Sequence, residues 1–286
     1  MTITITTSNV NGIRAAKRKG IEQWAAKNTP DVWCMQEVRA PQNEIDPIFD
    51  EFGFEYATAG RIADQSGLDR MNEICRIKGR AGVGLLSALP VIDKRYGLPG
   101  LAEDVDSGRW IEADVKTPQG YTVTVVCVYV HAGNTDDPEK MKQKYRFLDT
   151  MLVRMGQLRD EAAHGGKQAV LCGDFNIAHT PLDIKNAKAN EKHAGFLPEE
   201  RAYVDKWLGE LEFVDVMRSL CEDIQGPYTW WSQRGRAFDN NVGWRIDYQF
   251  ATPELAETAR GFVIDKAPTY DLRWSDHAPL SITYDV

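Results

Sequence analysis

The sequence lacks any apolar run long enough to cross a membrane. No stretch among its 286 residues approaches the roughly 20 apolar residues that a spanning helix needs. The first ten residues, MTITITTSNV, have no basic segment followed by an apolar stretch and a small-residue cleavage site, so we expect no secretory signal peptide. These absences favour a cytoplasmic protein without a membrane anchor.

Cysteine is scarce, and its placement argues against two common roles. The five cysteines are odd in number and widely spaced, and no two of them form a CxxC pair. The pattern indicates neither a zinc site nor a disulfide framework. Three of them lie within apolar runs, which is typical of reduced core residues in a cytoplasmic protein.

The chain also lacks an excess of positive charge. Its formal net charge is −8, whereas proteins that bind nucleic acid are usually basic. Net charge does not exclude that function, because a local basic patch is enough for binding. A phosphodiesterase that holds a divalent cation also needs clustered carboxylates. The sequence contains no Walker-type loop, no GxSxG and no HExxH, so it offers no motif of a P-loop NTPase, an α/β-hydrolase or a zincin protease.

Strand and helix patterns mix along the whole chain. Alternating or continuous apolar segments predict strands at 2–6, 32–35, 83–86, 110–116, 121–130, 169–172, 244–251, 261–265 and 279–284. Helical spacing of apolar residues predicts helices at 14–27, 138–162 and 198–211, and residues 61–80 are predicted to be a loop. Because a hairpin at Thr117–Gly120 interrupts any strict βα repeat, we expect an α/β sandwich with mixed sheets. No linker divides the chain, so we expect one domain over residues 1–286.

Residues able to do chemistry follow the predicted strands at or near their ends. They are Asn9, Asn11, Glu37, Tyr129, Asp174, Asn176, Asp247, Asp276 and His277. Loops at strand ends commonly carry functional sites. Each residue alone also has an ordinary explanation, such as a turn for Asn11, a solvated loop for Glu37 or a core position for Tyr129. Asp247 is harder to explain, because it interrupts an apolar strand where a buried carboxylate is costly unless it is paired or coordinated.

As a set, these side chains suit the hydrolysis of a phosphate ester. The oxygen ligands fit Mg²⁺, with Mn²⁺ as an alternative, and the amides can donate hydrogen bonds to phosphate oxygens. One histidine has carboxylates available to orient it. Hydrolysis requires an in-line water, a general base and positive charge near the phosphate oxygens. Which carboxylate is the base is left open by the sequence.

Eight segments resemble, in order, the exonuclease III family of abasic-site endonucleases within the endonuclease/exonuclease/phosphatase superfamily. They are SNVNGIR (8–14), MQE (35–37), GVGL (82–85), GDFNIA (173–178), LDI (182–184), GFLPEER (195–201), NVGWRIDY (241–248) and SDHAP (275–279). SDH is shared widely across the superfamily, whereas FLPEER and NVGWRID are more specific to the nuclease branch. The resemblance implies a four-layer α/β sandwich, with two mixed β-sheets face to face and helices outside.

The resemblance also implies a metal site. Glu37 would be the principal Mg²⁺ ligand, with Asn9 and Asp276 as further metal residues. Asn11 would lie nearby, at the substrate.

The resemblance assigns catalytic roles to five further residues. Asp174 would activate or orient the attacking water, and Asn176 would hold that water or a phosphate oxygen. His277, oriented by Asp247, would contact the scissile phosphate. Tyr129 would lie at the phosphate or the leaving group.

The expected substrate is double-stranded DNA with an abasic site or a blocked 3′ end. Trp230, Trp244 and Ile246 match an apolar pocket that accepts a baseless sugar, although tryptophans at such positions also occur as ordinary core residues. Arg14 is a candidate contact to a DNA phosphate. We expect the protein to act as a monomer that cleaves on the 5′ side of abasic sites and trims 3′ ends as exonuclease, phosphatase or phosphodiesterase.

One departure from the family pattern and two alternative functions stay open. The family commonly reads Tyr-x-Pro-Asn or Tyr-x-Pro-Gln where this chain has Tyr129-Val130-His131-Ala132, so the amide is replaced by Ala132. His131 or Asn134 would have to substitute, or the loop is rearranged. The alternatives are a superfamily phosphatase or phosphodiesterase on a non-DNA substrate, and a catalytically inactive nucleic-acid-binding regulator.

Overall fold

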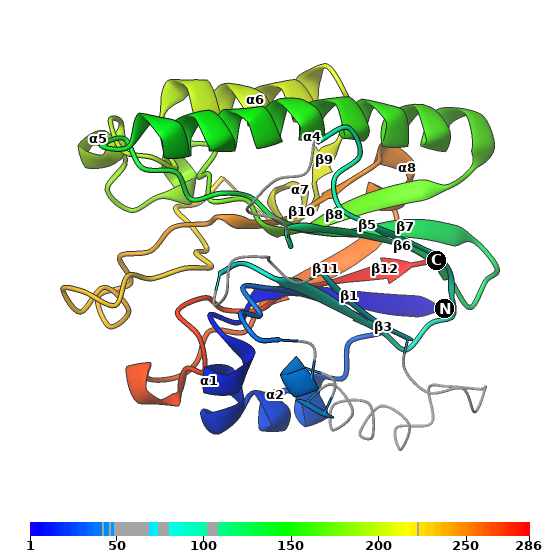
Figure 1. Ribbon diagram of the computed structural model, residues 1–286, viewed down its shortest axis with the longest axis horizontal. Helices are drawn as coiled ribbons and strands as arrows, with labels where there is room; N and C mark the ends of the chain where they lie inside the picture. The colour runs from blue at the N-terminus through cyan, green and yellow to red at the C-terminus, as the bar shows by residue number, and fades with distance from the viewer. Residues whose placement is uncertain (42, 46, 49–68, 74–79, 102–107, 222) are drawn as a thin grey trace.

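Two six-stranded sheets form the centre of the molecule in the computed structural model (Figure 1). The structure describes residues 1–41, 43–45, 47–48, 69–73, 80–101, 108–221 and 223–286. The first sheet has the order β11 (Ala259–Ile264), β12 (Leu280–Asp285), β1 (Thr2–Asn9), β2 (Val32–Gln36), β4 (Val83–Ser87), β3 (Asp69–Glu73). The second has the order β5 (Val91–Tyr96), β6 (Trp110–Lys116), β7 (Thr122–Tyr129), β8 (Gln168–Asp174), β10 (Asp247–Ala251), β9 (Val214–Asp215).

Each sheet has one parallel strand pair at its middle, and its other neighbouring strands run antiparallel. The parallel pairs are β1 with β2 and β7 with β8. The predicted hairpin joins β6 and β7, with Lys116 opposite Thr122. Both sheets are therefore mixed, as the sequence predicted.

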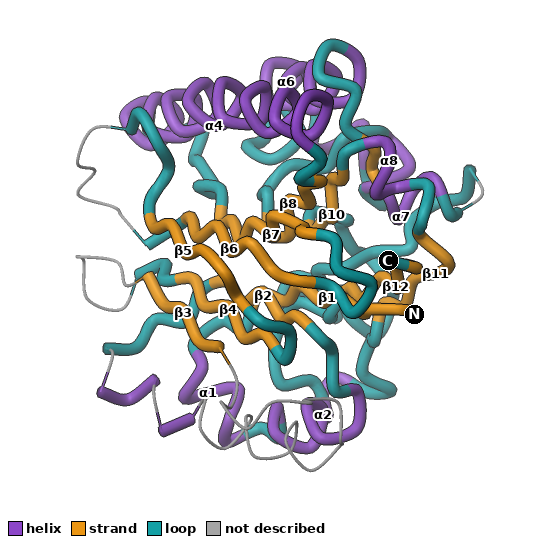
Figure 2. Tube along the Cα trace, turned by 90° about the vertical axis from the view of Figure 1, so that its right-hand side faces the viewer, coloured by secondary structure: helices purple, strands orange, loops and turns teal. Residues whose placement is uncertain are grey.

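Helices cover the outer face of each sheet (Figure 2). The long helix α4 (Pro138–Gly165) and α6 (Pro198–Gly209) lie over the second sheet, and α1 (Ile13–Arg18) and α2 (Ile21–Asn28) lie over the first. Shorter helical segments are α5 (Ala187–Asn190), α7 (Val216–Ser219), α8 (Pro253–Ala256), η1 (Pro181–Asp183) and η2 (Tyr270–Leu272). The four-layer α/β sandwich is confirmed. No helix within the described ranges is both long and apolar enough to cross a membrane.

Three apolar clusters hold the layers together. One lies between the sheets and includes Ile5, Cys34, Val125 and Cys172, all 0% exposed. A second packs the second sheet against α4 and α6, and a third packs the first sheet against α1 and α2. The buried cysteines are free thiols, as the sequence predicted.

The elements of the structure differ from the predicted ones in several places. The helix predicted over 14–27 is two helices, because Gly20 adopts a left-handed conformation (φ 94°) that ends the first and begins the second. Within the predicted loop 61–80, residues 69–73 form the edge strand β3, paired with β4; residues 61–68 and 74–79 lie outside the described residues. Strand β5 was not predicted, because its residues Ile92 to Tyr96 are largely exposed and polar.

Strand register brings distant residues to the same edge of the sandwich. Asn9 and Gln36 are partners at the ends of β1 and β2, and Glu37 follows directly. In the second sheet Asp174 is the partner of both Tyr129 and Asp247. The two sheets therefore present their polar strand ends to each other at one end of the molecule.

Candidate active site

Asn9 joins the two sheets through hydrogen bonds to two carboxylates. Its side-chain amide donates to Glu37 Oε1 (2.8 Å) and to Asp174 Oδ2 (2.9 Å). The Tyr129 hydroxyl donates to the same Glu37 oxygen at 2.8 Å. Asn9 is fully buried, and Glu37 and Tyr129 are each 9% exposed. Burial and the charge of Asp174 raise the pKa of Tyr129 to about 12, so this phenol is a proton donor at neutral pH.

Arg39 lies against Glu37 on the solvent side. Its guanidinium pairs with Glu37 Oε2 and donates to Asn11 Oδ1 at 2.9 Å. The Asn11 amide in turn donates to Asp276 Oδ1 at 2.7 Å. Glu37, Arg39 and Asn11 all have positive φ (53°, 52° and 46°), so tight turns after β1 and β2 aim these side chains at one point. The contacts that Arg39 makes with Glu37 and Asn11 were not predicted from the sequence, because an arginine three positions after a strand has no distinguishing pattern.

Asp174 and Asn176 form the part of the site that follows β8. The Asn176 backbone N–H donates to Asp174 Oδ1 (2.9 Å), and its side-chain amide donates to Asp174 Oδ2 (3.2 Å) and to the Val130 carbonyl (3.0 Å). Burial and the charge of Asp247 raise the pKa of Asp174, and the charge of His277 lowers it; together they bring this pKa to about 7. A carboxylate with a pKa near neutrality is suited to general-base chemistry.

Asp247 orients His277. The fully buried Asp247 accepts a hydrogen bond from His277 Nδ1 at 2.9 Å, and His277 Nε2 lies 3.8 Å from Asp174 Oδ2. Burial lowers the pKa of His277, but the charges of Asp247 and Asp174 outweigh it and raise that pKa to about 9. The imidazole is thus a cation at neutral pH, with Nε2 directed toward Asp174.

Two groups of residues have the composition of a cation site. Asp174, Asp247 and His277 place ligand atoms within 4.8 Å of one another. A metal bound at this group would require the imidazole of His277 to give up its proton. The oxygen donors of Glu37, Asn11 and Asp276 fit a hard cation better. The Arg39 guanidinium already lies between Glu37 and Asn11, which shows that these oxygens favour positive charge.

The predicted aromatic residues lie beside His277. The Trp230 and Trp244 rings meet edge to face with centroids 6.0 Å apart, and Trp230 lies 6.4 Å from His277. Both tryptophans are partly buried around Ile246, which is 5% exposed. Trp230 also donates to Asp276 Oδ2 at 3.2 Å. These aromatic residues therefore contact the polar site.

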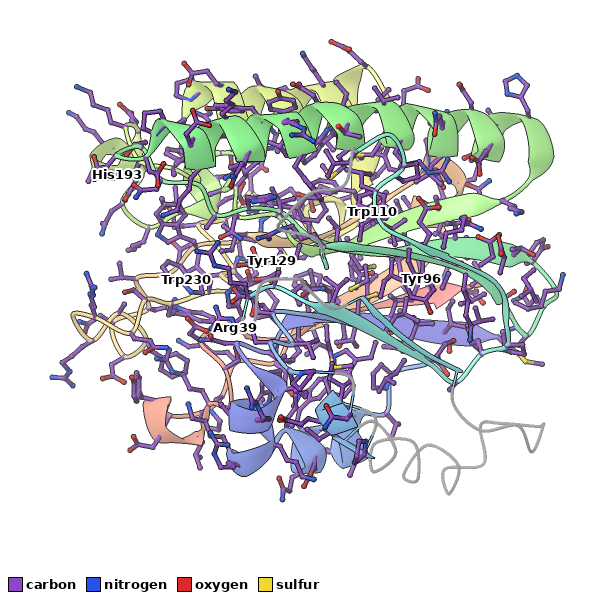
Figure 3. All side chains as sticks on the ribbon, in the orientation of Figure 1. Arg39, Tyr96, Trp110, Tyr129, His193 and Trp230 are labelled. Atoms are coloured by element: carbon purple, nitrogen blue, oxygen red, sulfur yellow. The ribbon has the colours of Figure 1, made fainter. Side chains whose placement is uncertain are left out.

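A cationic cavity of about 410 Å³ adjoins Glu37 and Tyr129. Its lining includes four basic side chains, which are Arg39, Arg80, Arg109 and Lys140. The Arg109 guanidinium lies 4.7 Å from the centre of the Tyr129 ring. Figure 3 shows Arg39, Tyr129 and Trp230 toward the same end of the molecule, away from Tyr96. The predicted Arg14 is not among the residues that line this cavity; it pairs with Glu44 and donates to the carbonyl of the lining residue Arg39.

The loop after Tyr129 has no amide at position 132. Ala132 lines the cavity, and its carbonyl accepts a hydrogen bond from Lys144 at 3.2 Å. His131 packs edge-on against Phe147, with centroids 5.5 Å apart, and Asn134 accepts the N–H of Asp136 to close a turn. Sequence reasoning missed Lys144, although its place in the apolar stripe between Met141 and Leu148 was a usable signal.

Comparisons with known proteins cover nearly the whole chain. A family model described as "Endonuclease/Exonuclease/phosphatase family" matches residues 6–277. An exodeoxyribonuclease of Bacillus subtilis (strain 168) is 29% identical over 279 residues, which are 97% of this chain and 98% of that protein. An AP endonuclease structure from Archaeoglobus fulgidus is similar with a TM-score of 0.80 and 30% identity, covering 99% and 100%. A 3′-5′ exonuclease structure from Neisseria meningitidis is similar with a TM-score of 0.81 and 26% identity, covering the same shares.

Proposed function

We propose, from the premise that the chain belongs to the endonuclease/exonuclease/phosphatase family, that it is a magnesium-dependent DNA repair nuclease. It hydrolyses the phosphodiester bond on the 5′ side of an abasic site, and it trims 3′ ends as exonuclease and 3′-phosphatase or phosphodiesterase. The matches to an exodeoxyribonuclease and an AP endonuclease confirm the predicted resemblance to exonuclease III-type enzymes.

The bridge that Asn9 makes between Glu37 and Asp174 carries this proposal. The Asn9 amide donates to Glu37, the proposed cation-binding carboxylate, at 2.8 Å and to Asp174, the proposed base, at 2.9 Å. His277 adds a cationic donor whose Nε2 is 3.8 Å from Asp174. In-line hydrolysis of a phosphoester requires a base, positive charge and a metal-binding carboxylate around one point. We assign these parts to Asp174, His277 and Glu37.

The side-chain amides of Asn9 and Asn176 hold Asp174 in place through hydrogen bonds. Asp174 then accepts a proton from the attacking water. The water oxygen forms a bond to phosphorus, and the bond from phosphorus to the 3′ oxygen breaks. His277 donates a hydrogen bond to a phosphate oxygen as negative charge grows there, and Asp247 holds its ring. Tyr129 lies on the Glu37 side and supplies a phenolic O–H to the phosphate or the leaving oxygen. The products are a 3′-hydroxyl and a 5′-phosphate.

Glu37, Asn9, Asn11 and Asp276 are the residues that would hold the metal. Magnesium supplies Lewis acidity and stabilises negative charge on the leaving oxygen when it is bound. One carboxylate oxygen of Glu37 accepts hydrogen bonds from Tyr129 and Asn9. The other oxygen pairs with the Arg39 guanidinium on the solvent side. Arg39 and a bound cation would therefore compete for this Glu37 oxygen.

Two surfaces beside the centre favour DNA as the substrate. Trp230, Trp244 and Ile246 form an apolar wall beside His277, which suits a sugar without its base. The basic side chains of the cavity beside Tyr129 suit the neighbouring phosphates of a strand. Arg14 supports that wall of basic groups through its contact with the Arg39 carbonyl. We further propose that the protein acts as a cytoplasmic monomer on double-stranded DNA.

A phosphatase on a small non-DNA substrate and an inactive nucleic-acid-binding protein are less consistent with the site. The apolar wall around Ile246 does not suit the many hydroxyl groups of an inositol phosphate. An inactive relative would not need to keep the buried Asp247–His277 pair, since a buried charge pair is costly to maintain.

A panel of three substrates tests the proposal. The protein is incubated with Mg²⁺ and a duplex carrying one abasic-site analogue, an otherwise identical intact duplex, or a phosphoinositide. We expect a single nick on the 5′ side of the analogue. Phosphate release from the phosphoinositide without nicking of the duplex would overturn the proposal in favour of the phosphatase.

A further inference from the structure

Helix α4 buries a lysine beneath the loops that carry the active site. Lys144 is 0% exposed, and its ammonium donates to the carbonyl oxygens of Ala132 (3.2 Å) and Asn176 (2.9 Å). Glu200 of α6, also 0% exposed, pairs with it at 2.5 Å. Burial lowers the pKa of Lys144, and the Glu200 charge opposes this effect. Because a buried ion pair seldom stabilises a fold more than apolar residues of similar size, its value here lies in what it holds in place.

Lys144 holds the backbone of Asn176 in an uncommon conformation. Asn176 has φ 50°, in the left-handed region that asparagine adopts more readily than most residues. Its side-chain amide is thereby directed back to Asp174 Oδ2 (3.2 Å) and the Val130 carbonyl (3.0 Å). Since the Asn176 carbonyl is fixed by Lys144, the peptide cannot rotate without breaking a charge-assisted hydrogen bond.

Glu200 extends the same network toward the aromatic wall. Its second oxygen accepts the N–H groups of Gly195 (2.6 Å) and Leu197 (3.0 Å). Gly195 has φ +92°, and a Cβ at this position would lie 3.0 Å from the Trp244 ring and 3.1 Å from the Asn176 carbonyl. The Gly195 backbone therefore fills the space between Trp244 and Asn176.

We propose that Lys144 and Glu200 are positioning residues, which fix the Asn176 side chain on Asp174. Neither residue contacts the substrate. Their effect on the reaction therefore passes through Asn176 and appears in kcat rather than in KM. The proposal rests on the proposed phosphodiesterase function.

A double-mutant cycle with Asn176 tests this. Lys144→Met combined with Glu200→Leu replaces the ion pair by apolar residues and avoids a lone buried charge. Because misplacement of a catalytic group by about 1 Å can cost about 100-fold, we expect kcat to fall about 10- to 100-fold with KM nearly unchanged. In an Asn176→Ala background the same pair of substitutions should lower kcat by less than about twofold, since the group they position is already gone.

The pair of Arg154 and Glu112 supplies a matched control. Arg154 lies on the same helix and is 8% exposed, and it pairs with Glu112 at 2.8 Å. The double variant Arg154→Met with Glu112→Leu should change the melting temperature by a similar amount to Lys144→Met with Glu200→Leu. It should leave kcat unchanged.

Two outcomes would overturn the positioning role. One is an equal loss of kcat in the wild-type and Asn176→Ala backgrounds, and the other is an equal loss in the control pair. Glu200→Gln keeps an acceptor for the Gly195 N–H but removes the charge that pairs with Lys144. It should also lower kcat, so it tests the positioning role even if the double variant does not fold. Running the cycle on bis(p-nitrophenyl) phosphate as well as abasic DNA separates this inference from the proposed substrate, because Asn176 acts on any phosphodiester.

Discussion

Substituting Arg39 tests whether Glu37 is the metal ligand. In the absence of metal, the Arg39 guanidinium occupies the solvent side of Glu37 and also holds Asn11 at 2.9 Å. A cation that binds Glu37 must displace it. Arg39→Met should therefore tighten Mg²⁺ binding, because the carboxylate no longer has a competing partner.

The size of this effect follows from the exposure of the pair. The Arg39 side chain is 39% exposed, so solvent screens the interaction and its value is that of a surface ion pair, about 0.2–1 kcal/mol. Because 1.4 kcal/mol corresponds to about a tenfold change in affinity, we expect Mg²⁺ to bind roughly 1.4- to 5-fold more tightly. The gain should shrink as salt rises.

Calorimetric titration of the DNA-free protein with Mg²⁺ measures this change directly. Arg14→Met is the matched control, because Arg14 is 51% exposed and pairs with Glu44 rather than Glu37. It should leave the affinity unchanged. Weaker Mg²⁺ binding in Arg39→Met would refute the reasoning, since Arg39 would then support the metal site instead of competing for it.

Three further predictions follow from the same geometry. Glu37→Ala should raise the Mg²⁺ concentration needed for activity, whereas Asp174→Asn should abolish activity even with excess metal; superimposable metal titrations for wild type and Glu37→Ala would disprove the ligand assignment. Trp244→Ala should reduce abasic-site cleavage more than trimming of ordinary 3′ ends, and equal losses would make the ring a core residue only. In the metal-free protein His277 should titrate near pH 9 by NMR. Because its pKa is raised in the folded state, His277 stabilises the fold fully below about pH 6.5, and this contribution is lost as pH rises through about 9. Asp247→Asn should therefore lower both the pKa of His277 and the free energy of unfolding at neutral pH. An unchanged His277 titration in Asp247→Asn would contradict the pairing.

The sequence predicted the polar strand ends of the candidate site because strand and turn patterns are local. Asn9, Glu37 and Asp174 each follow a short apolar segment, and parallel pairing of β1 with β2 and of β7 with β8 then brings them to one edge. The resemblance to a known family supplied the order of these segments and the expectation of two facing sheets.

Features that depend on distant partners could not be predicted in this way. Lys144 reads as an ordinary helix lysine until Glu200 and two loop carbonyls are seen around it. Arg39 becomes part of the site only because positive φ values turn it onto Glu37. Strand β3 is polar and becomes a strand by pairing with β4, and the helix break at Gly20 depends on one residue's backbone angle.

Mapping the ends of the cleaved strand tests the central claim most directly. A duplex with one abasic-site analogue, labelled at the 5′ end of the damaged strand, is mixed with excess protein in Mg²⁺ or in EDTA. We predict that the first labelled product ends in a 3′-hydroxyl directly on the 5′ side of the analogue, that it forms in Mg²⁺ but not in EDTA, and that it is absent with Asp174→Asn. Incision on the 3′ side of the analogue, or undiminished incision in EDTA or with Asp174→Asn, would contradict the account.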